Sequence, residues 1–328
     1  MKKNERYHYT DLAKLIPQFQ ALPQPCLMNE AETEARWAHL QVAIIWLHED
    51  GAKIDQRLQP WVKESLQHLE INCHKDQPCP WPILILNRSP KQTVSIRLGE
   101  GASLHCGLIT LNAQPQATPH YLNQHIELAA KAALRLWHAS LPVSPILIEN
   151  TVIVAEKAAQ VQVEHLQQSE SLHREELDVH LRGDGARLKI SGLQSGVGRA
   201  HLDYQLRVYH EADATGSEVE FSGIADDHSR VIFDGLIHVP AHIKGVDANE
   251  QTRNLLLSNT AEIDAKPELE IYSHEIACRH GASVGNLDEN ALFYLQSRGF
   301  SASEARLLLV QAFKARVFDQ GSLVGQLI

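Results

Sequence analysis

The sequence predicts a mainly β protein with helical segments at both ends. The chain has 328 residues, of which 44% are apolar and 21% charged, as is ordinary for a globular protein. From about residue 144 onward, short β-rich runs follow one another, separated by turn residues such as Gly183-Asp-Gly185. After residue 287 apolar residues recur at helical spacing instead. These observations predict a central β body followed by a short helical unit.

The first 143 residues are predicted as an α/β region. Apolar residues recur at helical spacing in three segments, and a proline-rich stretch at residues 77–82 excludes regular structure locally. Two further runs have the composition of strands. The predicted helices lie at about residues 29–47, 59–69 and 121–139, and the predicted strands at 83–86 and 93–98.

The β body is predicted over residues 144–285 from its β-branched and aromatic runs, which alternate with turn residues. No long helical pattern interrupts this series. The predicted strands lie at 146–154, 161–165, 177–181, 188–190, 202–208, 219–221, 231–239 and 269–271.

A weak internal repeat indicates how these strands are arranged. Leu98-Gly-Glu-Gly-Ala-Ser-Leu104 resembles Leu181-Arg-Gly-Asp-Gly-Ala-Arg-Leu188, and residues 154–161 form a degenerate copy 27 residues before the latter. Each copy is a turn followed by a strand, and the spacing suits one coil of a solenoid. A β-sandwich is the alternative, since the number of strands does not exclude it.

The segment after residue 287 is predicted as two helices joined by a tight turn. Asp288 is a good N-cap for the first helix, and Gly299 suits the position after its last residue. Ser301 and Glu304 have the spacing of a capping box for a second helix, which runs to about Phe318. Two helices alone would leave much of their apolar surface exposed, so we expect them to contact the β body or another protein.

Composition excludes several classes of protein. The formal net charge of −10 argues against non-specific nucleic-acid binding, which needs clustered Lys and Arg. The N-terminal residues lack the apolar stretch of a secretory signal, and the longest early apolar run is far too short to span a membrane. The cysteines are too few for a disulfide scaffold. We therefore expect a cytoplasmic protein with free thiols at Cys26, Cys73, Cys79, Cys106 and Cys278.

Cys278 and His280 are the strongest candidate ligands in the sequence. In an extended backbone, residues two apart present their side chains on the same face. Thiolate and imidazole both suit iron, zinc or copper(I), but two ligands leave a site incomplete, so a second chain or a bound substrate would have to complete it. The alternative is structural: Cys278 packs as a small apolar residue, and His280 hydrogen-bonds at the Gly281 turn. For Cys73 and Cys79, the intervening prolines and the missing fourth ligand argue against a metal site.

Common catalytic motifs are absent from the sequence. The glycine-rich residues 192–199 lack phosphate-loop spacing and the Lys-Ser/Thr ending, so we expect no ATP hydrolysis by this chain. Neither G-x-S-x-G nor H-E-x-x-H occurs. We therefore expect a protein that is not an enzyme.

Several stretches of the C-terminal third resemble one known family. They include Cys278-Arg-His-Gly-Ala-Ser-Val-Gly285 and Leu292-Phe-Tyr-Leu-Gln-Ser-Arg-Gly299, together with residues 230–239, 251–257 and 261–272. On these highly specific residues the chain is similar to the SufB/SufD family, the scaffold proteins of the SUF iron–sulfur cluster assembly system. It resembles the SufD-like branch, since His280 begins the sequence His-Gly-Ala-Ser-Val-Gly.

The resemblance implies a right-handed parallel β-helix core at residues 144–285, an N-terminal α/β region at 1–143 and a C-terminal helical domain at 286–328. It implies a complex with a SufB-like paralogue and a SufC-like ABC-type ATPase. The two β-helices would pair, and a transient iron–sulfur cluster would form at their interface, with no cofactor bound tightly to this chain alone.

The resemblance also assigns residues. The family histidine tied to the interface falls on His280 and the motif cysteine on Cys278. The helices that bind the ATPase place candidate contacts at Leu292, Phe293, Tyr294, Arg298, Leu308 and Phe313.

Two other functions stay open beside this one. A homo-oligomeric β-helix module with an inert Cys-x-His motif would form a homodimer through the same edge. A β-helix enzyme acting on polysaccharide would need a groove rich in aromatic residues, which make up only 6% of the chain.

Overall fold

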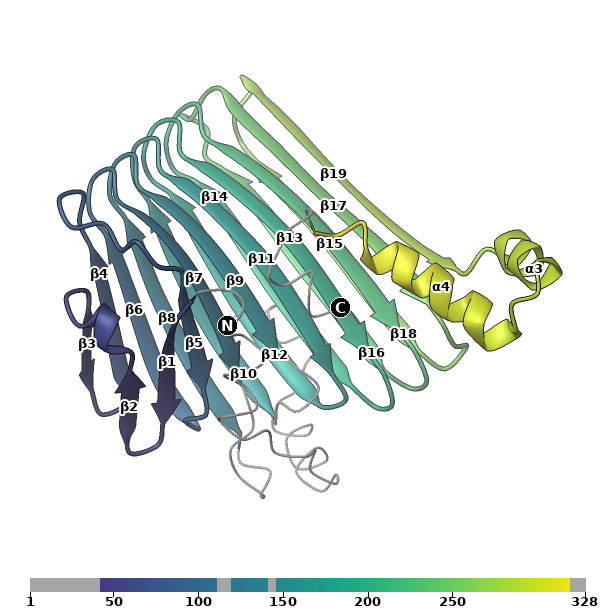
Figure 1. Ribbon diagram of the computed structural model, residues 1–328. Helices are drawn as coiled ribbons and strands as arrows, with labels where there is room; N and C mark the ends of the chain where they lie inside the picture. Colours follow the sequence, from purple (N-terminus) through teal and green to yellow (C-terminus); the bar gives the residue numbers. More distant parts are fainter. Residues whose placement is uncertain (1–41, 111–118, 141–145, 319–328) are drawn as a thin grey trace, which may run out of the picture.

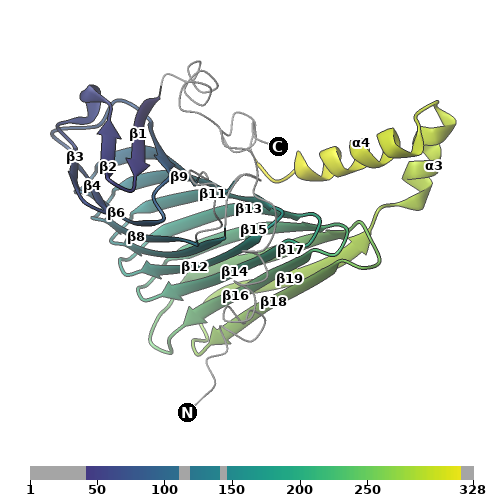
Figure 2. The same ribbon diagram turned by 90° about the horizontal axis from the view of Figure 1, so that it is seen from below.

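The chain forms a parallel β-helix followed by two helices, as Figure 1 shows. This computed structural model describes residues 42–110, 119–140 and 146–318. Within these residues the strands form two sheets of ten and nine strands. Figure 2 shows them from below. From β4 onward, successive strands alternate between the sheets, so each coil of the chain adds one strand to each sheet.

The ten-stranded sheet contains, in spatial order, β19 (Ile276–Asn286), β17 (Val246–Leu256), β15 (Gly216–Ala225), β13 (Arg187–Gly196), β11 (Gln160–Ser169), β9 (Ala133–Ser140), β7 (Ser103–Thr110), β5 (Ile83–Asn87), β1 (Ala43–His48) and β2 (Gly51–Ile54). The nine-stranded sheet contains β18 (Glu262–Ile271), β16 (Arg230–Val239), β14 (His201–His210), β12 (Leu172–Leu181), β10 (Leu147–Ala155), β8 (His120–Leu128), β6 (Lys91–Leu98), β4 (His68–Cys73) and β3 (Val62–Ser65).

Equivalent side chains stack from coil to coil in register. Leu98, Leu128, Ala155 and Leu181 are successive Cα partners on β6, β8, β10 and β12. The first residues of the two clear copies of the predicted repeat, Leu98 and Leu181, therefore belong to one row of Cα partners. The degenerate copy begins at Val154, one residue before the partner in that row, Ala155. The pairing confirms the solenoid and excludes the sandwich, since neighbouring strands come from successive coils and run parallel.

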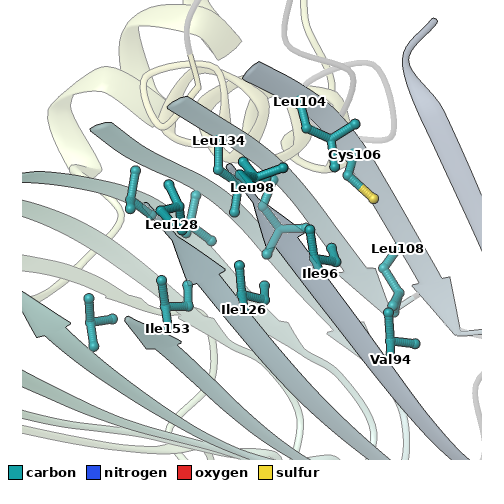
Figure 3. Close-up of a cluster of buried hydrophobic side chains, with 14 of the residues drawn as sticks. Val94, Ile96, Leu98, Leu104, Cys106, Leu108, Ile126, Leu128, Leu134 and Ile153 are labelled. Carbon is teal, nitrogen blue, oxygen red and sulfur yellow. The ribbon is translucent and has the colours of Figure 1, made fainter. Parts of the chain in front are cut away.

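The core fills the space between the two sheets. Along β8 buried and exposed residues alternate, so every second side chain points inward. Figure 3 shows the inward-pointing residues of adjacent strands stacked in rows, among them Ile96, Ile126 and Ile153. Ile96 and Ile126 are direct Cα partners, as are Ile126 and Ile153. Branched apolar side chains thus stack on their counterparts in the next coil, which holds the coils in register.

The tight turn at Gly183 fixes the approach of two neighbouring coils. A Cβ atom at this position would lie 1.8 Å from the backbone nitrogen of Lys157 in the preceding coil. Only glycine fits such an approach without moving the backbone. The predicted turn at Gly183-Asp-Gly185 is therefore confirmed, and Gly185 adopts a φ of 72°.

The two ends of the β-helix differ. At the N-terminal end, β1 pairs with β2 and β3 with β4 in antiparallel hairpins, next to the 3-10 helix η3 (Gln56–Leu58). At the other end, β18 and β19 are the last strands of their sheets. The helices α3 (Glu289–Ser297) and α4 (Ala302–Lys314) extend to one side of this end, as Figures 1 and 2 show.

Two predicted helices are wrong. Residues 121–139 form most of β8 and β9, and residues 59–69 contain β3 and the start of β4. Lys131 with φ of 59° and Gln67 with φ of 61° mark the turns that interrupt these segments. Two alternating strands separated by a short turn place apolar residues at intervals that imitate helical spacing.

The N-terminal region differs from the α/β expectation in its described part. The end of the helix predicted from residue 29 forms β1, and its beginning lies outside the described residues. β8 pairs directly with β10, so strand pairing continues across residue 143. The residues before 42 and after 318 lie outside the described part. No helix among the described residues has the length and apolar character to span a membrane.

The remaining predicted elements are confirmed. Nine of the ten predicted strands lie within observed strands and the tenth begins one residue before β10, although β2, β7, β17 and β19 were not predicted. Asp288 caps α3 by accepting hydrogen bonds from the backbone N–H groups of Asn290 and Ala291. Ser301 and Glu304 form the capping box of α4, and Gly299 has a φ of 98° between the helices.

Candidate functional site

The predicted ligands lie at the open end of the β-helix. Cys278 and His280 are on β19, which pairs with β17 and has no described strand on its other side. Their Cα partners on β17, Ala248 and Glu250, are both buried. Side chains alternate along a strand, so Cys278 and His280 continue the inward face of the β-helix to its last coil. The structure therefore places both residues on one face, as predicted.

Cys278 is half-buried in a small apolar cluster. Together with Leu269, Ile271 and Ile276, it packs against the buried residues Ile237, Val239, Ile243, Val246 and Ala248. Burial raises the pKa of the Cys278 thiol, because an apolar environment disfavours the thiolate. The thiol is therefore protonated in the isolated chain, and a bound cation would be needed to stabilise the thiolate.

Glu250 is a third potential ligand that the sequence analysis did not identify. Glu250 is the Cα partner of His280 on the neighbouring strand, and its side chain is fully buried. Neither of its carboxylate oxygens has a hydrogen-bond partner among the described residues. A Cβ atom at Gly235 would lie 2.1 Å from Oε1 of Glu250, so this glycine leaves the space that the carboxyl group fills. Burial raises the pKa of Glu250 to about 8, and the charge of Asp234 adds to the effect.

Cys278, His280 and Glu250 are separate candidate ligands in the isolated chain, since they are not among the groups of three described residues whose donor atoms lie within 4.8 Å of one another. A thiol, an imidazole and a carboxyl group lie on adjacent positions of β17 and β19, and His280 is exposed to solvent. Such donors suit iron and other first-row metals. An unpaired buried carboxyl group is costly in an isolated chain and is the type of group that a cation or a polar partner would stabilise.

The predicted contact residues on the helices fall into two groups. Phe293, Tyr294 and Leu308 are exposed to solvent by 74%, 57% and 43%, while the guanidinium of Arg298 lies over the Tyr294 ring at 5.2 Å. Leu292 is half-buried. Phe313 packs with Val317 and Phe318 in an apolar cluster with residues of the ten-stranded sheet. The exposed group is available to a partner, whereas Phe313 contributes to holding α4 on the body.

One arginine anchors α4 to the β-helix. The guanidinium of Arg306 donates hydrogen bonds to both carboxylate oxygens of Asp226 at 3.2 Å and to the carbonyl oxygen of Leu257 at 2.5 Å. Both acceptors lie just after strands of neighbouring coils, β15 and β17. Because β19 ends at Asn286 and α3 begins at Glu289, the strand that carries His280 leads almost directly into the helices.

The other described cysteines are core residues. Cys73 and Cys106 are fully buried in the main apolar cluster, and Cys79 packs against it. Burial raises the pKa of Cys73 to about 12 and raises that of Cys79 as well. Among the described residues, neither Cys73 nor Cys79 belongs to a group of three potential ligands within 4.8 Å.

The chain matches known proteins over most of the β-helix and the helices. Residues 92–313 match the family described as SUF system FeS cluster assembly, SufBD core domain. The chain is 31% identical over 204 residues to the iron–sulfur cluster assembly protein SufD of Escherichia coli, a match that covers 61% of this chain and 48% of that protein.

Two further relatives agree with this match. A SufBD family protein of Synechocystis sp. is 39% identical over 107 residues, which are 32% of this chain and 24% of that protein. The chloroplastic protein ABCI7 of Arabidopsis thaliana is 24% identical over 205 residues, which are 61% of this chain and 43% of that protein. In all three cases the matched stretch spans less than half of the relative's length. Since the family match covers more than half of this chain, the chain belongs to the SufBD family of iron–sulfur cluster assembly proteins.

Proposed function

We propose that this chain is a SufD-like scaffold subunit of the cytoplasm that pairs with a SufB-like paralogue and docks a SufC-like ABC-type ATPase. The chain itself catalyses no reaction. The iron–sulfur cluster is the cargo of the complex, and it forms transiently where the two β-helices meet.

The proposal rests on the position of the candidate ligands Cys278 and His280, with the buried Glu250 on the neighbouring strand, at an uncapped end of the β-helix. Cys278 and His280 lie on β19 in the last coil, which no described strand covers, and Glu250 lies on β17 in the coil before it. A stacked fold normally needs a terminal cap, and an edge strand offers unpaired backbone groups to another chain. A partner that pairs with this end would therefore supply the missing ligands and cover the edge at once.

The apolar character of the open end supports pairing with another protein. Leu269, Ile271 and Ile276 are only partly buried there, and Val284 on β19 is 49% exposed. Partly exposed apolar residues at a sheet edge are typical of protein interfaces. A homodimer could form through the same surface, and the homo-oligomeric module is therefore the competing proposal.

The exposed side chains of the helices support docking of the ATPase. Phe293, Tyr294 and Leu308 are large apolar or aromatic residues that the β-helix does not cover. Aromatic residues in such positions commonly anchor protein interfaces. Movement of α3 would reach β19 through the short connection at residues 287–288, so ATP-driven closure of the ATPase subunits would reshape the region around His280.

Size-exclusion chromatography with light scattering tests the pairing. Val284→Glu introduces a charge at the open end, whereas Val197→Glu introduces the same charge at a valine that is 38% exposed in a turn after β13. We expect the wild type and the Val197 variant to form a complex with the SufB-like paralogue and the ATPase, and the Val284 variant to lose the paralogue. A Val284 variant that binds the paralogue normally would contradict the proposed surface. A wild-type chain that forms only homodimers would support the competing module.

A further inference from the structure

A second group of potential ligands lies deep inside the β-helix. It consists of three histidines and two glutamates, each at most 3% exposed: His138 on β9, Glu149 on β10, His165 on β11, and His173 and Glu175 on β12. The nearest strand of this interior cluster, β11, lies four strands away from β19 in the ten-stranded sheet. At about 4.8 Å per strand, it is roughly 19 Å from the open end. It is therefore distinct from the site at Cys278 and His280.

The donor atoms of the interior cluster alternate between imidazole and carboxylate. Glu149 lies between two histidines, with Oε1 at 3.2 Å from His138 Nε2 and Oε2 at 2.7 Å from His173 Nε2. Glu175 lies between two histidines as well, with Oε1 at 3.3 Å from His138 Nδ1 and Oε2 at 2.5 Å from His165 Nε2. The five side chains thus form one continuous row in which every carboxylate oxygen faces a ring nitrogen.

The strand pairing holds this row in place. His138 and His165 are Cα partners in the ten-stranded sheet, and Glu149 and Glu175 are Cα partners in the nine-stranded sheet. The histidine ladder and the glutamate ladder face each other across the interior. Because four paired strands fix the backbone, the donor atoms are positioned before any ligand binds, as a metal site requires.

The charge of the interior cluster needs compensation. The hydrogen-bond and ion-pair partners of Glu149 and Glu175 among the described residues are all histidines. Two carboxylates in a dry interior are costly unless positive charge accompanies them. Either protons on the imidazoles or one divalent cation between the two ladders would supply this charge. A divalent cation would balance the carboxylate charges, and neutral imidazoles would bind it through the lone pairs of their ring nitrogens.

The donor set matches first-row transition metals. His138, His165 and Glu175 have donor atoms within 4.8 Å of one another, and so do Glu149, His173 and Glu175. Two histidines and one carboxylate are a ligand set of non-haem iron(II), and imidazole also suits zinc. Two ligands of one ion with bonds of about 2.1 Å lie about 3.0–3.4 Å apart. The distances of 3.2 Å and 3.3 Å from His138 to Glu149 and Glu175 fall in this range. The distances of 2.7 Å and 2.5 Å that His173 and His165 make to these glutamates are hydrogen-bond lengths, so these contacts would have to lengthen when an ion binds.

The surroundings of the interior cluster fit a closed metal site. The hydroxyl oxygen of Ser140 lies 2.8 Å from His173 Nδ1, so the ring nitrogen that points away from the carboxylates has a partner. Such a second partner typically fixes the orientation of a metal-binding histidine. On the side toward the open end, the rings of Tyr204 and Phe221 lie 4.6 Å and 6.0 Å from the His165 ring. These aromatic residues separate the cluster from Glu250 and His280.

We propose that the interior cluster binds one divalent first-row transition-metal ion, of the iron(II) or zinc(II) class, between the two ladders. Glu175 belongs to both groups of donors and is the central ligand. Since all five side chains are buried, the ion enters while the chain folds and then exchanges slowly. The bound ion stabilises the middle of the β-helix and is not the cluster that forms at the open end.

Metal analysis of the purified full-length chain tests the proposal. The protein is produced in separate minimal media supplemented with iron(II), zinc(II), cobalt(II) or magnesium, purified without oxygen and dialysed against a weak chelator. We expect about one ion per chain from the iron, zinc or cobalt medium and none from the magnesium medium. The comparison among the first three media identifies the preferred metal.

Variants locate the bound ion. We expect Glu175→Gln to hold less than about a tenth of the wild-type metal, and the double variant Cys278→Ala/His280→Ala to keep the full amount. His125→Gln, at an exposed position of β8, serves as the surface control. Metal that is retained by Glu175→Gln and lost by the double variant would overturn the proposal. Only the Cys278→Ala/His280→Ala variant changes the open end. If the interior cluster binds no metal, the proposed function at the open end can therefore still be tested separately.

A measurement on the wild type covers the case in which Glu175→Gln does not fold. The chain is unfolded with chelator and refolded with either cobalt(II) or chelator. We expect cobalt(II) to raise the unfolding midpoint and to give the visible absorption of nitrogen and oxygen ligands without a thiolate charge-transfer band. If the wild type takes up less than about a tenth of an ion per chain in every medium and on refolding, the interior cluster is only a hydrogen-bonded network.

Discussion

Glu250 on β17 and His280 on β19 are Cα partners at the open end of the β-helix, one fully buried and the other exposed to solvent. Neither oxygen of Glu250 has a hydrogen-bond partner among the described residues. The isolated chain thus keeps a buried carboxyl group next to its candidate ligand histidine, although an apolar or paired residue would be more stable. Buried polar groups without a partner and groups with strongly shifted pKa values are common at functional sites.

We predict that Glu250→Gln stabilises the isolated chain near neutral pH. The pKa of Glu250 is raised from 4.5 to about 8, so between these values the unfolded chain loses a proton that the folded chain keeps. Stability from this group is complete below pH 4.5 and falls as pH rises toward 8. Glutamine removes this dependence, and we expect a gain of about 1–3 kcal/mol at neutral pH by urea unfolding.

If the proposed complex with the SufB-like paralogue and the ATPase forms, the same substitution should weaken cluster assembly, because a candidate carboxylate ligand is removed. The matched control is Glu220→Gln on β15, where the glutamate is partly exposed and outside the site. If Glu250→Gln leaves both stability and assembly unchanged, Glu250 has no part in the site.

We predict that acid destabilises the fold through His210. This buried side chain has Nδ1 at 2.8 Å from the Thr215 hydroxyl and Nε2 at 3.0 Å from the Ser217 hydroxyl. Burial lowers the pKa of His210 from 6.5 to about 4, and Arg187 adds to the effect. Between these values the unfolded chain binds a proton that the folded chain does not, so stability falls as pH falls from 6.5 toward 4.

Urea unfolding at about pH 7.5 and about pH 5 measures this effect. In His210→Gln the loss of unfolding free energy between the two conditions should be smaller than in the wild type by about 1–2 kcal/mol. His125→Gln, at an exposed position, should keep the wild-type dependence. An unchanged pH dependence in His210→Gln would show that other groups cause the acid sensitivity.

We predict that Gly183→Ala destabilises the β-helix by about 3 kcal/mol or more, because the added methyl group meets the backbone of Lys157 at 1.8 Å. Gly285→Ala is the control, since a Cβ atom there has no neighbour within 4 Å and φ is not in the left-handed region. Thermal unfolding compares the two variants. Equal unfolding midpoints would mean that the turn relaxes without cost.

We predict that Phe293→Ser and Leu308→Ser each weaken binding of the SufC-like ATPase by about tenfold or more, because anchor residues carry most of an interface's energy. Both side chains are exposed, at 74% and 43%, so the fold should be unaffected. Leu66→Ser, at a residue that is 68% exposed in the turn between β3 and β4, is the control. Calorimetric titration with the ATPase measures the affinities, and wild-type binding by both variants would exclude this face.

The strands of the β body and both C-terminal helices could be predicted from sequence, because each depends on a local pattern. Asp288 and Ser301 cap their helices through contacts within three residues. The helix predicted at residues 121–139 failed for the same reason, since local spacing does not distinguish one helix from two strands around the Lys131 turn. Only pairing with strands of other coils decides between them.

The site could be predicted in part. Cys278 and His280 were found because they are neighbours in sequence, whereas Glu250 comes from the preceding coil and joins them only through the register of β17 and β19. The interior cluster combines residues from β9 to β12, and no spacing between them marks a metal site. One signal in the sequence could have identified Glu250. Side chains alternate along β17, so Glu250 points into the core on the same side of the strand as Val246 and Ala248.

Reconstituted cluster assembly with His280→Ala tests the central claim most directly. The full-length chain, the SufB-like paralogue and the ATPase are combined with iron, a sulfide source and ATP, and the iron and acid-labile sulfide bound to the complex are measured. If His280 completes the site at the paired β-helices, the variant complex should form normally but hold less cluster by about tenfold or more. A variant complex that assembles as much cluster as the wild type would contradict the account and leave the Cys278-x-His280 motif with a structural role.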